Sequence, residues 1–280
     1  MKASDGFDVV DQVQTEGALV EVVQYSKLHG SSDIRTAESL FFANQAGIRL
    51  KMVRIVLENS FIRVEPGALY YMRGRLEMRS STGGGMMKAL KRKLTSGESF
   101  LVNEIHGTGE IFLEPTFGHF FLHAIGPEEG GLIVDKGMFY AGTAGLDITS
   151  KMQKNVSSGA FGGEGWFQTG IMGSGVAVLY SPVPREEVVK YTLAGDKLSV
   201  DGNFALMRSA TVEFRAEKSS KSWFSTAFSG EGLLQTFSGN GHVWLAPTQG
   251  VYEKLALPGG LEALSRPPGS TGTMTTTSVK

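Results

Sequence analysis

Three glycine-rich segments recur along this chain, and this internal repeat limits its fold more than any other feature of the sequence. Each copy holds a Gly-Glu pair followed by a Gly-x-Gly triplet. The copies are Gly97-Glu98 with 107–109, Gly163-Glu164-Gly165 with 173–175, and Gly230-Glu231-Gly232 with 239–241. The glycine of the pair recurs at spacings of 66 and 67 residues. Self-similarity at a fixed period indicates supersecondary units that bury apolar faces against one another. We predict three units, at about residues 62–130, 131–196 and 197–262.

Each unit has the pattern of β structure. Short alternating runs such as Leu76–Met78 and Val212–Phe214 are separated by glycines at close intervals, which is typical of a β-sandwich or barrel. Glycine adopts a positive φ without a steric penalty, so we predict that the Gly-x-Gly triplets form hairpin turns. The sequence predicts an all-β fold, with three β-sandwich units around a pseudo-threefold axis in a single domain over residues 41–262.

The two ends of the chain differ from this pattern. Residues 1–40 are treated as an N-terminal extension, in which Gly17–Tyr25 predicts a strand. Residues 263–280 are rich in Ser, Thr, Gly and Pro, and they predict a disordered tail because they hold too few apolar side chains to offset the entropy of ordering. Helical periodicity is clear only at Met86–Leu94.

Composition excludes several classes of protein. The chain has no cysteine, so disulfide frameworks, thiolate metal sites and cysteine nucleophiles are ruled out. Its net charge of −1 argues against a nucleic-acid binder. The N-terminus has no secretory pattern and no apolar run is long enough to span a membrane, so we expect a cytoplasmic location, with peripheral contact at a membrane surface.

A Lys-x-x-Lys pair precedes each Gly-Glu pair. The basic residues are Lys88, Lys91 and Arg92 in the first copy, Lys151 and Lys154 in the second, and Lys218 and Lys221 in the third. If the units superpose, these cations gather at one end of the molecule and predict a surface that binds an anionic membrane or an acidic protein partner. The alternative is a solvated polar face without a partner.

The remaining chemistry-bearing residues favour structural roles. The repeated glutamates, Glu98, Glu164 and Glu231, could hold a cation on a threefold axis, but they more simply accept backbone N–H bonds in glycine turns. His119 and His123 share one face of a strand, yet the His-x-His and Glu pattern of a cupin metal site is missing. We predict no metal, no cofactor and no catalytic residues.

Several blocks resemble the "altered inheritance of mitochondria" family, whose bacterial members were long classed as a domain of unknown function. The resemblance covers about residues 40–255, and the blocks that carry it are 82–85, 163–166, 230–233 and, most specifically, 239–245. It implies a fold similar to three copies of the tryptophan RNA-binding attenuation protein unit, which is double-stranded β-helix-like. It implies no catalytic residues, because none is established for the family.

These observations predict a non-enzymatic β scaffold that binds a protein partner or an anionic surface. A cupin-like metal-dependent or small-molecule-binding enzyme is the first alternative, and RNA binding, by fold analogy only, is the second. The open edges of the sheets could also pair between chains, so a homo-oligomer is compatible with the sequence.

Overall fold

The computed structural model describes residues 6–30, 32–80, 102–152, 167–201, 203–218 and 233–266. These residues form a nearly all-β protein, which confirms the predicted fold class. The strands are β1 (Phe7–Thr15), β2 (Ala18–Tyr25), β3 (Lys51–Val64), β4 (Leu69–Ser80), β5 (Asn103–Leu113), β6 (His119–Ile125), β7 (Leu132–Val134), β8 (Phe139–Thr143), β9 (Leu146–Met152), β10 (Phe167–Gly173), β11 (Gly175–Ser181), β12 (Val189–Asp201), β13 (Ala205–Ser209), β14 (Glu213–Lys218) and β15 (Leu233–Leu245). The helices are α1 (Ile34–Gln45), α4 (Gln249–Leu255) and α5 (Gly260–Leu264).

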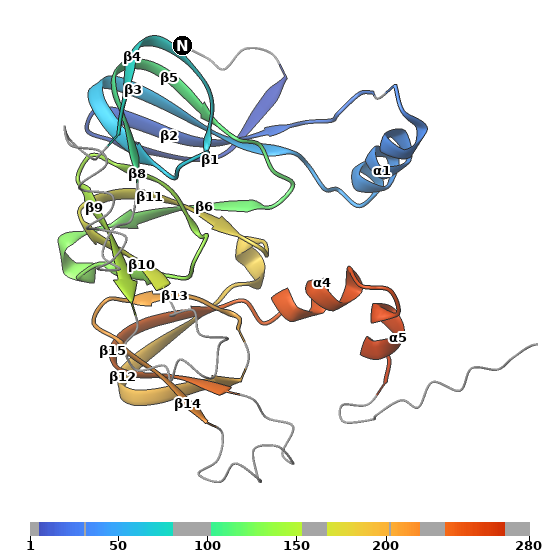
Figure 1. Ribbon diagram of the computed structural model, residues 1–280, viewed down its shortest axis with the longest axis vertical. Coiled ribbons are helices and arrows are strands. Elements are labelled where there is room, and N and C mark those ends of the chain that lie inside the picture. The colour runs from blue at the N-terminus through green and yellow to red at the C-terminus, as the bar shows by residue number, and fades with distance from the viewer. Residues whose placement is uncertain are drawn as a thin grey trace, which may run out of the picture.

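One pattern of strand pairing occurs three times along the chain. In unit one, β5 pairs with β3 on one edge and with β4 on the other. In unit two, β10 pairs with β7 on one edge and with β9 on the other, and β11 pairs with β6 on one edge and with β8 on the other. β10 and β11 together therefore take the place of β5. In unit three, β15 lies between β12 and the pair β13 and β14. The units follow one another along the longest axis of the molecule (Figure 1). The repeat boundaries and the pseudo-threefold axis stay predictions.

Two sheets run through these units. The larger one has the order β1-β2-β3-β8-β11-β6, with β5 attached to β3 and β4 attached to β5. The smaller one has the order β12-β15-β13-β7-β10-β9, with β14 attached to β15. Unit two therefore contributes strands to both sheets. Apolar clusters cross both boundaries between units, because Ile62 packs in one cluster with Ala141, and Val134 packs in another with Met207.

The Gly-x-Gly triplets do not form hairpin turns, so that prediction was wrong. The triplets at 107–109 and 239–241 lie inside the continuous strands β5 and β15, and the triplet at 173–175 joins β10 to β11, which belong to different sheets. A Cβ on Gly109 would lie 2.3 Å from the Arg73 carbonyl oxygen, and a Cβ on Gly175 would lie 2.4 Å from Oγ1 of Thr143. The φ angle of both glycines is +158°. Glycine is needed here because long strands bend against a neighbouring chain segment.

The N-terminal residues are part of the larger sheet. The strand predicted at Gly17–Tyr25 is confirmed as β2, which forms a hairpin with β1 and pairs with Lys51–Leu57 of β3. Helix α1 follows on an arm between β2 and β3, and it has no buried residue (Figure 1). The helix predicted at Met86–Leu94 and residues 267–280 of the predicted tail lie outside the described residues.

Candidate functional site

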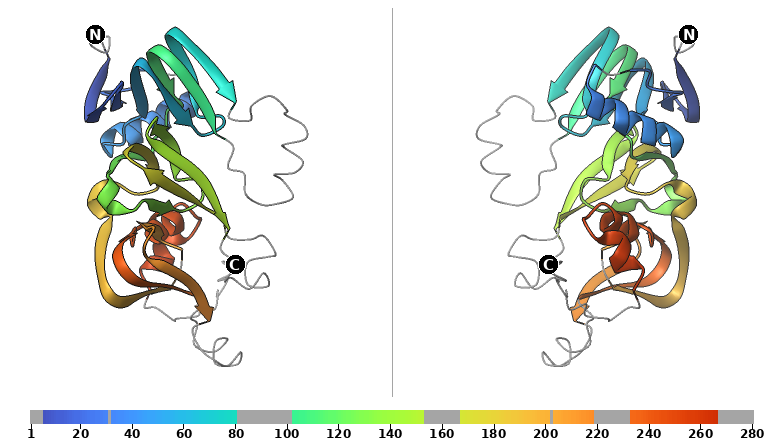
Figure 2. Two further views of the ribbon diagram at one scale, coloured as in Figure 1. Left: turned by 90° about the vertical axis from the view of Figure 1, so that its left-hand side faces the viewer. Right: turned by 90° about the vertical axis from the view of Figure 1, so that its right-hand side faces the viewer.

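The segments with the predicted basic residues connect equivalent strand pairs. They join β4 to β5, β9 to β10 and β14 to β15, where the last paired residues are Ser80 and Asn103, Met152 and Phe167, and Lys218 and Leu233. β4, β9 and β14 run toward the same side of the molecule, the right-hand side in the left panel of Figure 2. We call this side the hairpin-end side. The structure therefore brings the three attachment points together along one side of the row of units.

Most of the predicted site residues lie outside the described residues. Only the backbones of Lys151 and Lys218 are placed, in β9 and at the end of β14. The residues outside are Lys88, Lys91, Arg92, Gly97, Glu98, Lys154, Gly163, Glu164, Gly165, Lys221, Gly230, Glu231 and Gly232.

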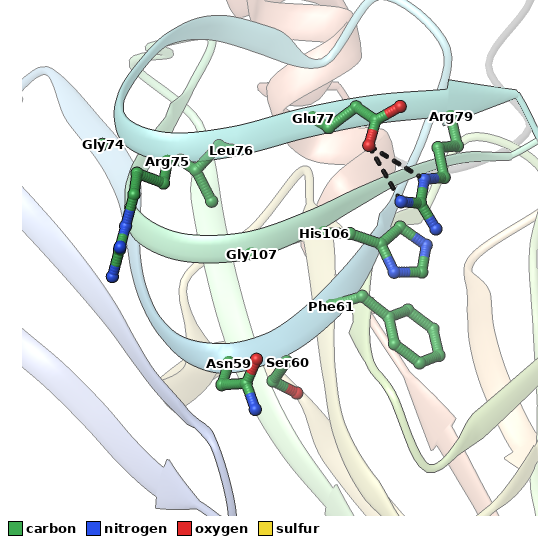
Figure 3. A pocket seen from close by; sticks show the side chains of 10 residues that line it. All are labelled: Asn59, Ser60, Phe61, Gly74, Arg75, Leu76, Glu77, Arg79, His106 and Gly107. Atoms are coloured by element: carbon green, nitrogen blue, oxygen red, sulfur yellow. Dashed lines mark hydrogen bonds and ion pairs between the residues drawn. The ribbon is translucent and has the colours of Figure 1, made fainter.

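A polar pocket of about 520 Å³ lies on β3, β4 and β5, in the half of these strands next to the hairpin-end side. Phe61, His106 and Glu77 are cross-strand neighbours and form one row across its floor (Figure 3). The rings of Phe61 and His106 stack with centroids 4.7 Å apart and planes 18° apart. Such a stack orients the imidazole and leaves its edge accessible from the pocket.

Charged side chains form the next row of the same face. Glu104 lies between Arg63 and His106, with oxygen-to-nitrogen distances of 3.2 Å and 3.0 Å. Arg79 donates a hydrogen bond of 2.8 Å to Glu77, which raises the pKa of Arg79 and lowers the pKa of Glu77 (Figure 3). Arg63 is directly opposite Glu104 on the neighbouring strand, and such residues project to the same face. Glu104 and His106, like Glu77 and Arg79, are two residues apart on one strand, which also places them on one face.

Arg75 is the remaining cation of this pocket. It is exposed and has no carboxylate partner among the described residues. Two arginines that line the pocket (Arg75 and Arg79) stand against one glutamate (Glu77), so 2 − 1 leaves one positive charge in excess. The arrangement therefore suits an anionic group better than a cation.

Sequence reasoning missed this pocket. A signal was present, because Arg73, Arg75, Glu77 and Arg79 alternate with other residues along β4, and period-two charge marks a solvated strand face. Phe61 and His106 gave no comparable signal, since their contact depends on the register between β3 and β5.

The two histidines considered as metal ligands have different surroundings. Burial lowers the pKa of His119, and it lowers the pKa of His123 against the opposing effect of Glu129. Nε2 of His123 lies 3.4 Å from a Glu129 oxygen, and its ring meets Trp244 edge to face. Within the part of the chain that the structure describes, no three His, Asp or Glu side chains are placed to hold a metal ion.

Three β units with equivalent strand pairing, joined in a row by antiparallel contacts, define a class of β-repeat protein. The chain matches the family described as mitochondrial biogenesis AIM24 over residues 43–248, and it belongs to this family, as the resemblance predicted. It is 22% identical over 233 residues to an uncharacterised protein of Streptococcus pyogenes serotype M6, covering 79% of this chain and 91% of that one.

A solved structure shows the same fold. The crystal structure of a Streptococcus pyogenes protein matches with a TM-score of 0.56 and 21% identity, covering 78% of this chain and 94% of the other. Among the described helices, none is both long and apolar enough to cross a lipid bilayer.

Proposed function

We propose that this AIM24-family protein is a non-enzymatic scaffold whose hairpin-end side binds an anionic membrane surface. The observation that carries this proposal is the common direction of β4, β9 and β14, because the three Lys-x-x-Lys pairs lie at or after the ends of these strands in the sequence. Clusters of four to eight basic residues are the usual signature of contact with anionic lipid. The pair is repeated in three units, so the sequence holds six such lysines.

The described charges support the same side. The pocket on β3, β4 and β5 has one positive charge in excess, and Arg75 lies there without a carboxylate partner among the described residues. The whole chain has a net charge of −1, so an attraction to anionic lipid must come from an uneven distribution of charge. Such an attraction is screened by salt, because the Debye length falls to about 3 Å at 1 M ionic strength.

Flotation with vesicles tests this proposal. The purified full chain is mixed with vesicles of phosphatidylcholine, with or without phosphatidylserine, at low and high salt. We expect binding only to the anionic vesicles and only at low salt. Alanine at Lys88, Lys151 and Lys218 should weaken binding at least about tenfold, since each lysine near an anionic surface contributes about 1 kcal/mol.

The matched control has the same change of charge elsewhere. Alanine at Lys27, Lys136 and Lys254, which are exposed and lie outside the three connecting segments, should leave vesicle binding unchanged. If both triple variants lost vesicle binding equally, the change in net charge alone would explain the loss. This result would overturn the assignment of membrane binding to the hairpin-end side. Absence of binding at every salt concentration would overturn the membrane proposal and favour a protein partner.

A further inference from the structure

The two ends of the row of units each carry a long strand with one open edge. Among the strands that the structure describes, β4 of the first unit pairs only with β5, and β12 of the third unit pairs only with β15. Figure 1 shows β4 and β12 at opposite ends of the longest axis. Among the described residues, no strand of unit one pairs with a strand of unit three.

Successive units inside the chain are joined by one type of contact, which we call a joint. In the first joint, β3 pairs antiparallel with β8, and Val64 is opposite Ala141. In the second joint, β7 pairs antiparallel with β13, and Val134 is opposite Met207. Both joints span three residue pairs and have the same direction.

A backbone hydrogen bond extends each joint by one step. The N–H of Glu65 donates to the Tyr140 carbonyl at 3.0 Å, and the N–H of Asp135 donates to the Leu206 carbonyl at 2.9 Å. Each donor directly follows the valine of its joint, and each acceptor directly precedes the residue opposite that valine. The two joints therefore have the same register as well as the same direction.

The open edge of β12 is the equivalent of the first partner in each joint. Each unit has a valine opposite the residue that lies six positions before the last glycine of its Gly-x-Gly triplet. The pairs are Val64 with Asn103, Val134 with Thr169, and Val200 with Gln235, and the glycines are Gly109, Gly175 and Gly241, respectively. Residues 198–200 of β12 therefore correspond to 62–64 of β3 and to 132–134 of β7. No described strand pairs with the edge of β12 that would enter a joint, and we call such an edge vacant.

The open edge of β4 is the equivalent of the second partner. The same glycines locate this edge, through the residue that lies three positions after each of them. The pairs are Tyr71 with Phe112, Ala141 with Val178, and Met207 with Trp244, after Gly109, Gly175 and Gly241, respectively. Residues 71–73 of β4 therefore correspond to 141–143 of β8 and to 207–209 of β13. Within the described part of the chain, the edge of β4 that enters a joint in the other units is vacant as well.

Burial differs between the filled and the vacant positions. Ala141 is 0% exposed and Met207 is 6% exposed, whereas the equivalent Tyr71 is 44% exposed. Tyr70 and Met72 beside it are also exposed, so the open edge of β4 carries a small apolar patch. Apolar side chains next to unpaired backbone groups are the usual composition of a strand that receives another strand.

We propose that copies of this chain associate head to tail, with β12 of one copy pairing antiparallel with β4 of the next. The register of the internal joints places Val200 opposite Tyr71 of the second copy and Ser199 opposite Met72. It also directs the N–H of Asp201 to the Tyr70 carbonyl of that copy. Such a heterologous contact repeats until a ring closes or a filament forms.

A cysteine pair tests the register directly, because the natural chain has no cysteine. Residues opposite each other in a hydrogen-bonded antiparallel pair have Cα atoms about 5.5 Å apart, within the range of a disulfide. Purified Ser199→Cys and Met72→Cys chains are mixed and oxidised, and we expect a disulfide-linked dimer on a non-reducing gel. Arg75→Cys replaces Met72→Cys as the control, since it lies on the same strand about 10 Å further along.

Proline variants test the association itself. Residues alternate in the direction of their backbone groups, so the N–H groups of Ser199 and Met72 point to the open edges as those of Asp201 and Tyr70 do. Ser199→Pro and Met72→Pro each block one edge and leave the other intact. Each variant alone should have the chain mass of 30.1 kDa by light scattering, whereas the natural chain forms larger species. An equimolar mixture should form a dimer, because each variant keeps the edge that the other has lost.

The outcomes separate misfolding from a wrong proposal. A proline variant that unfolds gives no dimer in the mixture. In that case the crosslinking of Ser199→Cys to Met72→Cys tests the proposal instead. A natural chain that is monomeric at every concentration, with no more crosslinking of Ser199→Cys to Met72→Cys than to Arg75→Cys, overturns the proposal. Oligomers that survive both proline substitutions overturn it as well, since they must use another surface.

Discussion

Two buried arginines in different units have opposite surroundings. Arg54 in β3 is 2% exposed and contacts two carboxylates, at 2.6 Å from Glu21 and in a shorter contact with Glu110. Arg208 in β13 is 6% exposed and has no carboxylate partner among the described residues. Its guanidinium donates to the Val212 carbonyl at 3.0 Å, while its Nε has no hydrogen-bond partner within the described part of the chain.

The pKa values reflect this difference. Burial disfavours the charged form of Arg54, but the hydrogen bonds that its guanidinium donates to Glu110 and Glu21 outweigh it and raise the pKa. Burial alone lowers the pKa of Arg208 to about 10, so it remains charged at neutral pH without compensation from a carboxylate. Burial of a cation therefore has two different consequences in this protein, and removing each arginine should reveal them.

The largest effect is expected for Arg54→Met. This substitution leaves the buried carboxylates of Glu21 and Glu110 without their shared cation, and breaking a buried ion pair in this way costs about 3–5 kcal/mol. The free energy of unfolding should be measured by urea denaturation at pH 7. A triple variant with Glu21→Gln and Glu110→Gln should recover part of the loss, because it removes the uncompensated charges. A loss below about 1 kcal/mol in the single variant would contradict this account.

This buried network also shows where sequence reasoning ends. The all-β class and the repeat were predictable because glycine spacing and alternation are local patterns. Arg54 interrupts the apolar run of β3, which signals an unusual position, but its partners are 33 and 56 residues away and are fixed by strand register. Strand register also determines the structure of the Gly-x-Gly triplets. Their local sequence resembles that of turns, yet they lie at bends in long strands.

Helix α1 was missed for a related physical reason. Its apolar residues include the run Leu40-Phe41-Phe42, and none of its residues is buried, so they do not form the stripe by which a packed helix is recognised. The candidate pocket was missed because its residues meet only across β3, β5 and β4. The Lys-x-x-Lys pairs could be recognised in the sequence because their spacing follows the repeat. Their role stays a prediction, since most of these residues lie outside the described part of the chain.

His123 is a third buried basic residue, and it differs from Arg54 and Arg208 because it can avoid burying a charge by losing its proton. Burial lowers its pKa more than Glu129 raises it, and Arg185 and Lys190 act in the same direction as burial. The folded pKa is then below the unfolded value of 6.5, so stability is complete above about pH 6.5 and falls as the pH falls through the folded pKa.

We expect His123→Gln to reduce this acid sensitivity. Between pH 7 and pH 5 the variant should lose less of its free energy of unfolding than the natural chain, because it lacks the imidazole whose pKa burial lowers. Urea denaturation at several pH values measures this difference. His29→Gln, which removes an exposed histidine, is the matched control. Parallel pH curves for the natural chain and His123→Gln would show that His123 is not responsible.

Arg208→Met should change stability by less than about 1 kcal/mol, in contrast to Arg54→Met. The substitution loses hydrogen bonds to the Val212 carbonyl and to Gln168, and it loses the contact of the guanidinium with the Phe214 ring. It also removes the cost of burying a cation that lacks a carboxylate partner among the described residues. Urea denaturation beside Arg54→Met gives the comparison. Equal losses in the two variants would mean that the carboxylates contribute nothing specific.

The smallest effect is expected for Arg73→Ala. Arg73 contacts the same carboxylate as Arg54, but its side chain is 64% exposed whereas that of Arg54 is 3% exposed. Water already solvates an exposed guanidinium, so its ion pair contributes at most about 1 kcal/mol. Because Arg54 remains, Glu110 keeps a buried cation after the substitution. Denaturation in 1 M salt should narrow the difference between Arg73→Ala and the natural chain while leaving the Arg54→Met difference nearly unchanged. A loss for Arg73→Ala as large as that for Arg54→Met would show that the partner's charge, and not its burial, determines the strength of this network.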